Sequence, residues 1–377
     1  MDLGLSEEQE MLKASARDFL QKECPKQLVR QLDESEEGYS ADLWQKMAQQ
    51  GWMGLVFPEK YGGGGGRFLD LTVLLEEMGH NIVPGPFFST VVLGGLTILS
   101  AGSEEQRKEI LPKVASGEMI LSFALTEPTA SYEASSVRTK AVARDGQFII
   151  NGTKLFVLNA NVADYILCVA RTQETDNPEE GISLFLVDAG NPGVQCTLLD
   201  TLARDKQCEV IFDNVAVSEK NTIGKLGEGW PVVQDILQKA AVAKCAEMVG
   251  GAQAALEMAV DYAKERVQFG RPIGSFQAIQ HYCANMVTDV SGSRFITSKA
   301  AWKVSEGLPA AMDVAIAKAW TSEAYGRVTL LAHQIFGAIG FTMDHDMHLY
   351  YRRAKAGEII FGDADFQRAI VARELGL

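Results

Sequence analysis

Glu247 is a carboxylate in a stretch of small and apolar residues, where it could act as a base. Its neighbours are Ala246, Met248, Val249 and Gly250. Partial burial among such residues raises the pKa of a carboxyl group toward the range useful for taking up a proton. Alternatively, Glu247 is a structural residue that pairs with Lys244, three positions earlier on a helix, or faces solvent.

The segment Arg266-Val-Gln-Phe269-Gly270 places a guanidinium close to a glycine. A diphosphate is bound well by a guanidinium and by backbone N–H groups, and glycine lets the backbone approach closely. The alternative is a helix C-terminus, with a cation in the last turn and a capping glycine.

Two other patterns predict structure rather than chemistry. The five glycines of 62–66 are not enclosed by a strand and a helix of Rossmann type, so they predict a loop. His345 and His348 lie near two aspartates and could ligate a metal, but they are more typical of a polar turn between helices. We therefore predict no metal site.

Charge and composition exclude several classes of protein. The 377 residues are 47% hydrophobic and carry a formal net charge of −14. Nucleic acids and anionic membranes attract a basic surface, so binding to either is not expected. No apolar run is long enough to predict a membrane span. The six cysteines are scattered without a CxxC pair, which fits a reducing cytoplasm.

Element signals divide the chain into three predicted domains, 1–118, 119–226 and 227–377. The first is all-helical, with capping patterns at Ser6 and at Ser103. The second alternates short strands with turns, including Asp145-Gly146 and Asn151-Gly152, two strong hairpin signals. This pattern predicts a β-barrel-like domain.

The third domain is predicted to be a four-helix bundle. A long alanine-rich helix should begin at Trp230, and its small residues suit close helix packing. Helices over 275–306 and 309–336 and one short helix near the end complete it. The fold class is thus α+β and multidomain, with helices on either side of a β domain in the sequence.

Four segments, in order and spacing, make the whole chain resemble the acyl-CoA dehydrogenase family. They are Leu125-Thr-Glu-Pro128, the stretch from Arg266 to Gln277, the stretch from Gln334 to Phe341, and Gln367-Arg-Ala-Ile-Val-Ala-Arg-Glu374. Within the family, the phrases around Cys245 and Ile360 look most like pimeloyl-CoA dehydrogenase subunits and steroid side-chain dehydrogenases.

The resemblance implies a non-covalent FAD between the β domain and the C-terminal bundle. Leu125 and Thr126 match residues whose backbone bonds the flavin ring. The diphosphate and adenosine contacts match Arg266, Phe269 and Gln277, in part from a neighbouring subunit, and the adenosine end matches Gln334 and Gly337. The two residues beside the flavin are Phe156 and Leu158 here, in place of tryptophan and threonine.

The catalytic glutamate of the family is absent from both of its usual positions. Phe361 stands at the first, in Ile360-Phe-Gly-Asp363, and Ala240 at the second. Glu247 lies seven residues after Ala240, on the same helix face and about 10 Å further along. It is our candidate base. Asp363 is a weaker candidate, which could instead bond FAD hydroxyls or form a turn.

The substrate is expected to be an acyl-CoA thioester, which loses an α-proton to a base and a β-hydride to flavin N5. Tyr132 replaces a serine that commonly contacts CoA, and Phe361 would face the acyl group. The more apolar site suggests a cyclic or branched acyl group, and the resemblance to pimeloyl-CoA dehydrogenase subunits adds a dicarboxylic one. The expected electron acceptor is an electron-transfer flavoprotein.

Loss of both usual bases leaves two other functions open. The chain could be a base-less partner subunit of an α2β2 heterotetramer instead of an active homotetramer. It could also be a flavoenzyme of the same fold that performs elimination or 1,4-dehydrogenation on a CoA thioester.

Overall fold

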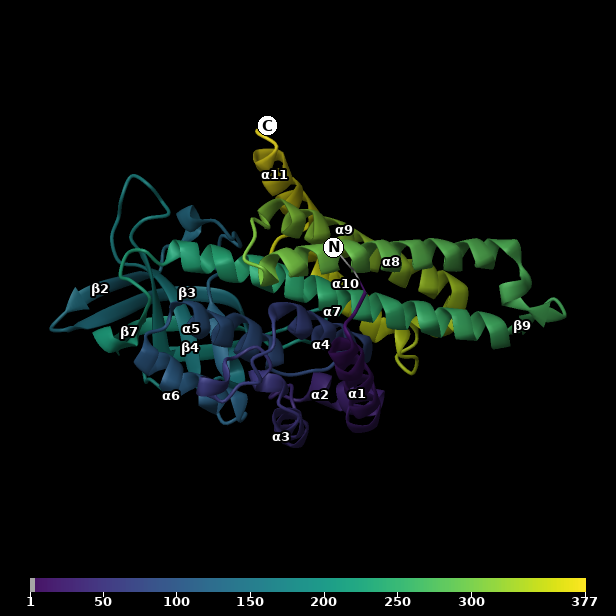
Figure 1. Cartoon of the computed structure of the whole chain (residues 1–377), viewed down its shortest axis with the longest axis horizontal. Helices are drawn as coiled ribbons and strands as arrows, with labels where there is room; N and C mark the ends of the chain where they lie inside the picture. The colour runs from purple at the N-terminus through teal and green to yellow at the C-terminus, as the bar shows by residue number, and fades with distance from the viewer. Residues whose placement is uncertain (1–3) are drawn as a thin grey trace. The chain divides into compact units, whose positions relative to one another are not determined.

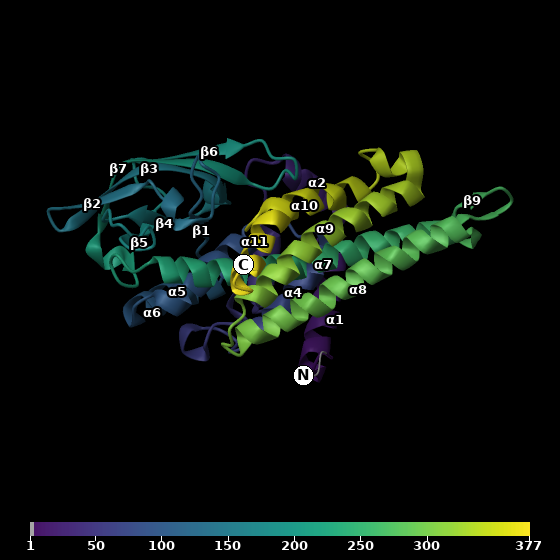
Figure 2. The same cartoon turned by 90° about the horizontal axis from the view of Figure 1, so that it is seen from above.

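The computed structural model describes residues 4–377, which form two compact units. The helical unit comprises the chain up to Val29, Arg67–Val83 and Gln238–Leu377, and the sheet unit comprises Arg30–Gly66 and Pro84–Leu237. Figures 1 and 2 give their elements from two directions. Segments far apart in the sequence therefore share one unit.

The N-terminal third is helical, as predicted. Its elements are α1 (Glu7–Glu23), α2 (Lys26–Glu34), α3 (Ala41–Gln49), α4 (Phe68–Asn81), a π-helical stretch (Phe88–Gly95), α5 (Leu96–Ala101) and α6 (Glu104–Ala115). Ser6 and Gln9 form a capping box at α1, and Ser103 and Gln106 form another at α6. Each pair satisfies amide groups that a helix start leaves without partners.

The predicted β domain is one eight-stranded sheet. Its strands are β1 (Leu121–Ala124), β2 (Lys140–Arg144), β3 (Gln147–Leu158), β4 (Tyr165–Arg171), β5 (Ile182–Asp188), β6 (Val194–Leu199), β7 (Gln207–Ser218) and β8 (Thr222–Ile223). Seven strands follow the order β6-β7-β3-β2-β4-β5-β8, and β1 pairs in parallel with β4. The long strands β3 and β7 pair antiparallel in its middle.

One of the two predicted hairpin turns is confirmed and the other is wrong. Asp145 and Gly146 both have positive φ and join β2 to β3. Asn151 and Gly152 lie inside β3, where its register with β7 shifts between Ile150 and Gly152. The Asn151 side chain accepts the amide of Asn214, so the pair forms an irregularity within a continuous strand.

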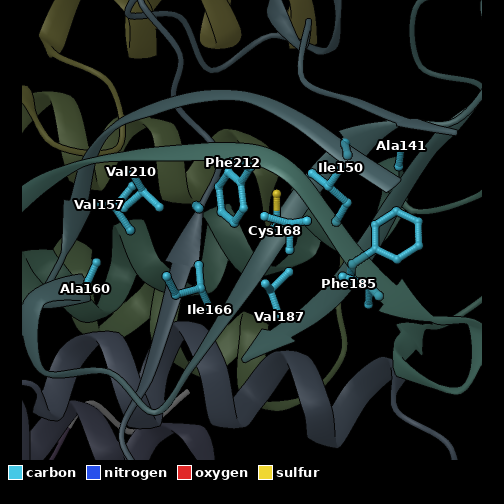
Figure 3. Close-up of a cluster of buried hydrophobic side chains, with 14 of the residues drawn as sticks. Ala141, Ile150, Val157, Ala160, Ile166, Cys168, Phe185, Val187, Val210 and Phe212 are labelled. Atoms are coloured by element: carbon cyan, nitrogen blue, oxygen red, sulfur yellow. The ribbon is translucent and has the colours of Figure 1, made fainter. Parts of the chain in front are cut away.

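Alternating side chains of these strands form the core of the sheet unit. Figure 3 shows part of the cluster, including Ile150 and Val157 from β3, Cys168 from β4 and Phe212 from β7. All of them are at most 2% exposed. Ile150 and Val157 are seven residues apart, so strict alternation alone would place them on opposite faces, and the register shifts of β3 between them bring both into the cluster.

The helical unit is built on α7 (Trp230–Glu265), α8 (Gln277–Ser305) and α9 (Ala311–Phe336). Helices α8 and α9 run side by side (Figures 1 and 2). Helix α4 crosses α7 at two glycines: a Cβ at Gly79 would lie 1.9 Å from the carbonyl oxygen of Glu247, and one at Gly250 would lie 1.8 Å from that of Glu76. The small residues predicted to allow close packing therefore bring two backbones into contact.

The C-terminus contains two short helices, where the sequence predicted one. They are α10 (Met347–Ile359) and α11 (Ala364–Glu374). Phe361 and Gly362 both have positive φ, which ends α10 and turns the chain. His348 lies in the first turn of α10, so only His345 of the predicted polar turn belongs to the connection.

Within residues 4–377, no helix combines the length and the hydropathy needed to cross a membrane. The same residues contain no group of three or more side chains arranged to hold a metal ion.

Candidate active site

The segment 125–127 directly follows β1, and a buried lysine holds its backbone in place. Lys154 Nζ donates to the carbonyl oxygen of Leu125 at 3.0 Å and to Glu127 Oε1 at 2.8 Å. The amide of Leu155 donates to the carbonyl oxygen of Thr126 at 2.8 Å. Strand β3 therefore fixes the two residues, Leu125 and Thr126, that the family resemblance assigns to the flavin ring.

Glu127 is buried with Lys154, and both of its carboxylate oxygens accept hydrogen bonds. Its two carboxylate oxygens accept the amides of Arg138 and Thr139 at 2.8 and 2.9 Å. Burial alone would raise the pKa of Glu127, but the Lys154 ammonium and these amides outweigh it and lower the pKa. The sequence analysis did not single out this pair. The available signal was a lysine in the middle of an apolar strand.

Phe156 and Leu158 lie at the end of β3. Phe156 has φ of 57° at a register shift between Lys154 and Val157, and 48% of it is exposed. This bulge turns an aromatic ring out of the sheet. Leu158 is half-buried, and its carbonyl oxygen accepts the Ser122 hydroxyl at 2.7 Å. Tyr132 lies half-buried in the segment before β2.

In the helical unit, Glu247 lies midway along α7 and pairs with Lys244. Lys244 Nζ and Glu247 Oε2 are 2.7 Å apart, and 30% of the Glu247 side chain is exposed. The pairing that the sequence left open as an alternative is therefore present. Lys244 therefore engages one carboxylate oxygen of Glu247, while part of the group stays accessible.

The turn between α10 and α11 contains Phe361 and Asp363. Phe361 is 8% exposed, and its carbonyl oxygen accepts Gln367 Nε2 at 2.7 Å. Asp363 is the N-cap of α11, where its Oδ1 accepts the amide of Phe366 at 2.9 Å. Asp363 thus performs the local structural role that the sequence gave as its alternative.

The Arg266–Gly270 segment forms a hairpin rather than a helix C-cap. Helix α7 ends at Glu265, and β9 (Val267–Gln268) pairs with β10 (Arg271–Pro272). Phe269 and Gly270, both with positive φ, make the tight turn, and Phe269 is 92% exposed. Gly270 therefore permits the turn of a hairpin, and Arg266 stands at its base.

The side chains available to hold FAD are polar and unengaged. Arg266, Gln277 and Gln334 are exposed, and their side-chain nitrogens make no hydrogen bond or ion pair to any of residues 4–377. Gly337 ends α9 with φ of 67° and has open space where a Cβ would stand. A guanidinium, two amides and an unobstructed glycine suit a dinucleotide with charged phosphates and hydroxyls.

In the sequence, a β sheet stands between two helical regions. This fold and these side chains define a flavoprotein. Three family models match the chain: the acyl-CoA dehydrogenase N-terminal domain over residues 6–118, the middle domain over 122–215 and the C-terminal domain over 227–376. The chain belongs to the acyl-CoA dehydrogenase family. It is an enzyme of the FAD-dependent acyl-CoA dehydrogenase type, and its cofactor is FAD.

Individual relatives match the chain over nearly its full length. An acyl-CoA dehydrogenase of Bacillus subtilis is 34% identical, covering 99% of both chains. The caffeyl-CoA reductase–Etf complex subunit CarC of Acetobacterium woodii is 29% identical, covering 97% of this chain and 98% of the relative.

Two solved structures share the fold. Butyryl-CoA dehydrogenase of Megasphaera elsdenii has a TM-score of 0.93 at 31% identity, with both chains fully covered. The ChsE4–ChsE5 complex of Mycobacterium tuberculosis has a TM-score of 0.91 at 30% identity, covering 100% of this chain and 99% of that one.

Proposed function

We propose that this chain dehydrogenates an acyl-CoA thioester, with Glu247 as the base that removes the α-proton. The observation that carries the proposal is that Glu247 is partly buried on α7, with 30% of its side chain exposed, whereas Asp363 faces solvent. Phe361 has no proton acceptor, and Asp363 already caps α11.

FAD, when bound, supplies the acceptor for the β-hydride. The residues of the chain have other tasks. Leu125 and Thr126 would bond the flavin ring, and Arg266, Gln277 and Gln334 would hold its phosphates and adenosine. Glu247 would take the proton onto a carboxylate oxygen and become neutral, next to the Lys244 ammonium that bonds the same carboxylate.

The acyl group is proposed to be cyclic, branched or dicarboxylic. Phe361 and Leu158 support a cyclic or branched group, because they replace polar residues of the family with apolar ones and so reshape the acyl site, whereas the dicarboxylic alternative rests on the resemblance to pimeloyl-CoA dehydrogenase subunits. A preference for short straight-chain thioesters in a substrate panel would contradict this part of the proposal.

The test is flavin bleaching. The purified chain is mixed anaerobically with a panel of acyl-CoA thioesters, and loss of the oxidised flavin absorption is followed. Glu247→Gln should abolish bleaching with FAD still bound. The matched control is Glu257→Gln, on the same helix, where the carboxylate bonds His80 at 2.8 Å. Unchanged bleaching in Glu247→Gln would remove Glu247 as the base.

A second candidate function is a base-less partner subunit in a heteromeric enzyme. The Lys244–Glu247 ion pair favours it, because it gives Glu247 a structural role and leaves no base. Purified protein that is colourless, and that gains FAD only with a second chain, would support it. Turnover without net flavin reduction would instead indicate elimination or 1,4-dehydrogenation.

We also propose that the chain assembles into a homotetramer or an α2β2 heterotetramer. Support comes from exposed Phe295 on α8 and from exposed Trp320 and Leu330 on α9, which would be costly in water. An electron-transfer flavoprotein is the proposed acceptor, since one relative is a subunit of an Etf complex. All six cysteines are free thiols, which supports a cytoplasmic location.

A further inference from the structure

Lys318 is a lysine on α9 that is completely buried and that bonds only neutral oxygens. Its three N–H groups are shared among four oxygens, the Ser322 hydroxyl at 2.9 Å and the carbonyl oxygens of Gly357, Glu358 and Gly362 at 3.0, 3.1 and 2.9 Å. No carboxylate lies within hydrogen-bond distance of its Nζ among residues 4–377.

The three carbonyl groups belong to one structural feature. Gly357 and Glu358 are in the last turn of α10, where carbonyl groups lack helical partners and attract a cation. Gly362 is in the turn that follows. The ammonium of Lys318 therefore joins the end of α10 to the turn. A side-chain amide has only two N–H donors and could not bond all three carbonyl oxygens.

The same turn is constrained from its other side. Phe361 and Gly362 have φ of 59° and 90°. A phenylalanine in the left-handed region costs free energy, so it persists only where neighbouring contacts hold it. Gln367 Nε2 holds the carbonyl oxygen of Phe361 and Lys318 holds that of Gly362, so successive carbonyl groups are fixed by separate side chains.

Burying an ammonium without a carboxylate in contact is costly, which argues for a specific role. Asp363 and Glu358 attract it at longer range, whereas Lys244 repels it. Its hydrogen bonds reach the Phe361 part of the candidate site but not Glu247. Lys244 pairs with Glu247, and Gly362 adjoins Phe361.

We propose that Lys318 is a positioning residue for substrate: it clamps the 361–363 turn and thereby fixes the Phe361 ring against the acyl group. This inference rests on the proposed function, because it takes Phe361 to face the acyl chain. Lys318 touches neither substrate nor FAD in this proposal and acts only through the turn.

The test compares Lys318→Met with Lys355→Met. Methionine keeps an unbranched side chain that is one atom shorter, and it removes the three donors. Lys355 is a suitable control because it lies on α10 but bonds only the Glu358 carboxylate, at 3.0 Å. Both variants are measured by amide hydrogen exchange over 360–367 and by kcat and KM with the thioester that bleaches the wild type best.

In Lys318→Met, we expect turn amides to exchange about tenfold faster and KM to rise about tenfold, with kcat and FAD content changed less than about threefold. Lys355→Met should match the wild type in each measurement. Unchanged exchange, or faster exchange with unchanged KM, would overturn the proposal. If Lys318→Met does not fold, Lys318→Gln keeps two donors and is judged by the same criteria.

The exchange measurement separates this proposal from the proposed function. If no thioester bleaches the flavin of the wild type, but the 361–363 turn exchanges faster in Lys318→Met, the proposed function and the substrate role of Lys318 are both rejected. Only its structural role in holding the turn then remains. If a thioester bleaches the flavin of the wild type, but the turn in Lys318→Met exchanges no faster, only the proposed role of Lys318 is rejected.

Discussion

At the scale of single residues, the candidate site differs from its family in which side chain could take the proton. By the family resemblance, Phe361 stands at the usual position of the base, and this residue is almost completely buried. Glu247 pairs with Lys244 and is partly accessible. General bases typically contribute 10²–10⁴-fold to a rate, so the assignment can be measured.

We predict that Glu247→Gln slows flavin bleaching by about 10²–10⁴-fold, because the amide cannot accept the proton. Adding Phe361→Glu to that variant should restore part of the rate, since it returns a carboxylate to the position used by the family. Stopped-flow absorbance of the flavin checks both. Equal bleaching by the wild type and Glu247→Gln would contradict the first part.

At the scale of elements, two buried contacts hold the site in shape. Lys154 on β3 ties down the segment after β1, and the glycines of α4 and α7 let those helices meet. The domain limits 1–118, 119–226 and 227–377 remain a prediction.

Lys154→Met should destabilise the sheet unit by about 3–5 kcal/mol, because it leaves the Glu127 carboxylate buried without its cation. Denaturant unfolding measures this. A second variant, Lys154→Met with Glu127→Leu, removes both charges and should recover much of the loss. Equal stability of the two variants would show that the buried charge is not the cause.

Gly250→Ala should destabilise the helical unit by about 3 kcal/mol or more, because its Cβ would overlap the carbonyl oxygen of Glu76. Gly292→Ala is the matched control in α8, where the nearest atom is Trp320 Nε1 at 3.6 Å. It should stabilise by about 0.5–1 kcal/mol, since alanine loses less entropy in a helix. A similar loss in both would rule out the overlap at α4 as the reason.

At the scale of the whole molecule, buried lysines couple stability to pH. Burial lowers the pKa of Lys318 to about 8 and that of Lys26, which donates to the carbonyl oxygen of Asn81, also to about 8. Both start from 10.5, so between these values the unfolded chain binds more protons. The unfolding free energy of the helical unit should therefore rise as pH increases above 8.

The contribution of Lys318 is isolated by measuring unfolding of the wild type and of Lys318→Met at pH 7, 8 and 9. The wild type should gain up to about 1.4 kcal/mol per pH unit relative to the variant above pH 8. Measurements should stop near pH 9, because buried thiols such as Cys245, whose pKa burial raises to about 12, lower stability above that. Parallel pH curves would contradict the prediction.

The sequence by itself determined the features whose causes are local. Ser6 and Gln9 are three residues apart and cap a helix, and Asp145-Gly146 makes a tight turn from two adjacent residues. Such signals depend on the φ preferences and hydrogen-bonding groups of neighbouring residues, and these follow directly from the order of residues in the sequence. The four spaced segments 125–128, 266–277, 334–341 and 367–374 likewise sufficed to predict the family and FAD.

Only the tertiary structure decided the partners of buried charges. Lys154 meets Glu127 across 27 positions, and Lys318 meets Gly362 across 44. Asn151-Gly152 stays within β3 because strand β7 pairs along its length, although the same dipeptide in isolation favours a turn. Burial, strand register and charge pairing depend on which distant residues the fold places beside a given residue. They therefore cannot be predicted from the spacing of neighbouring residues.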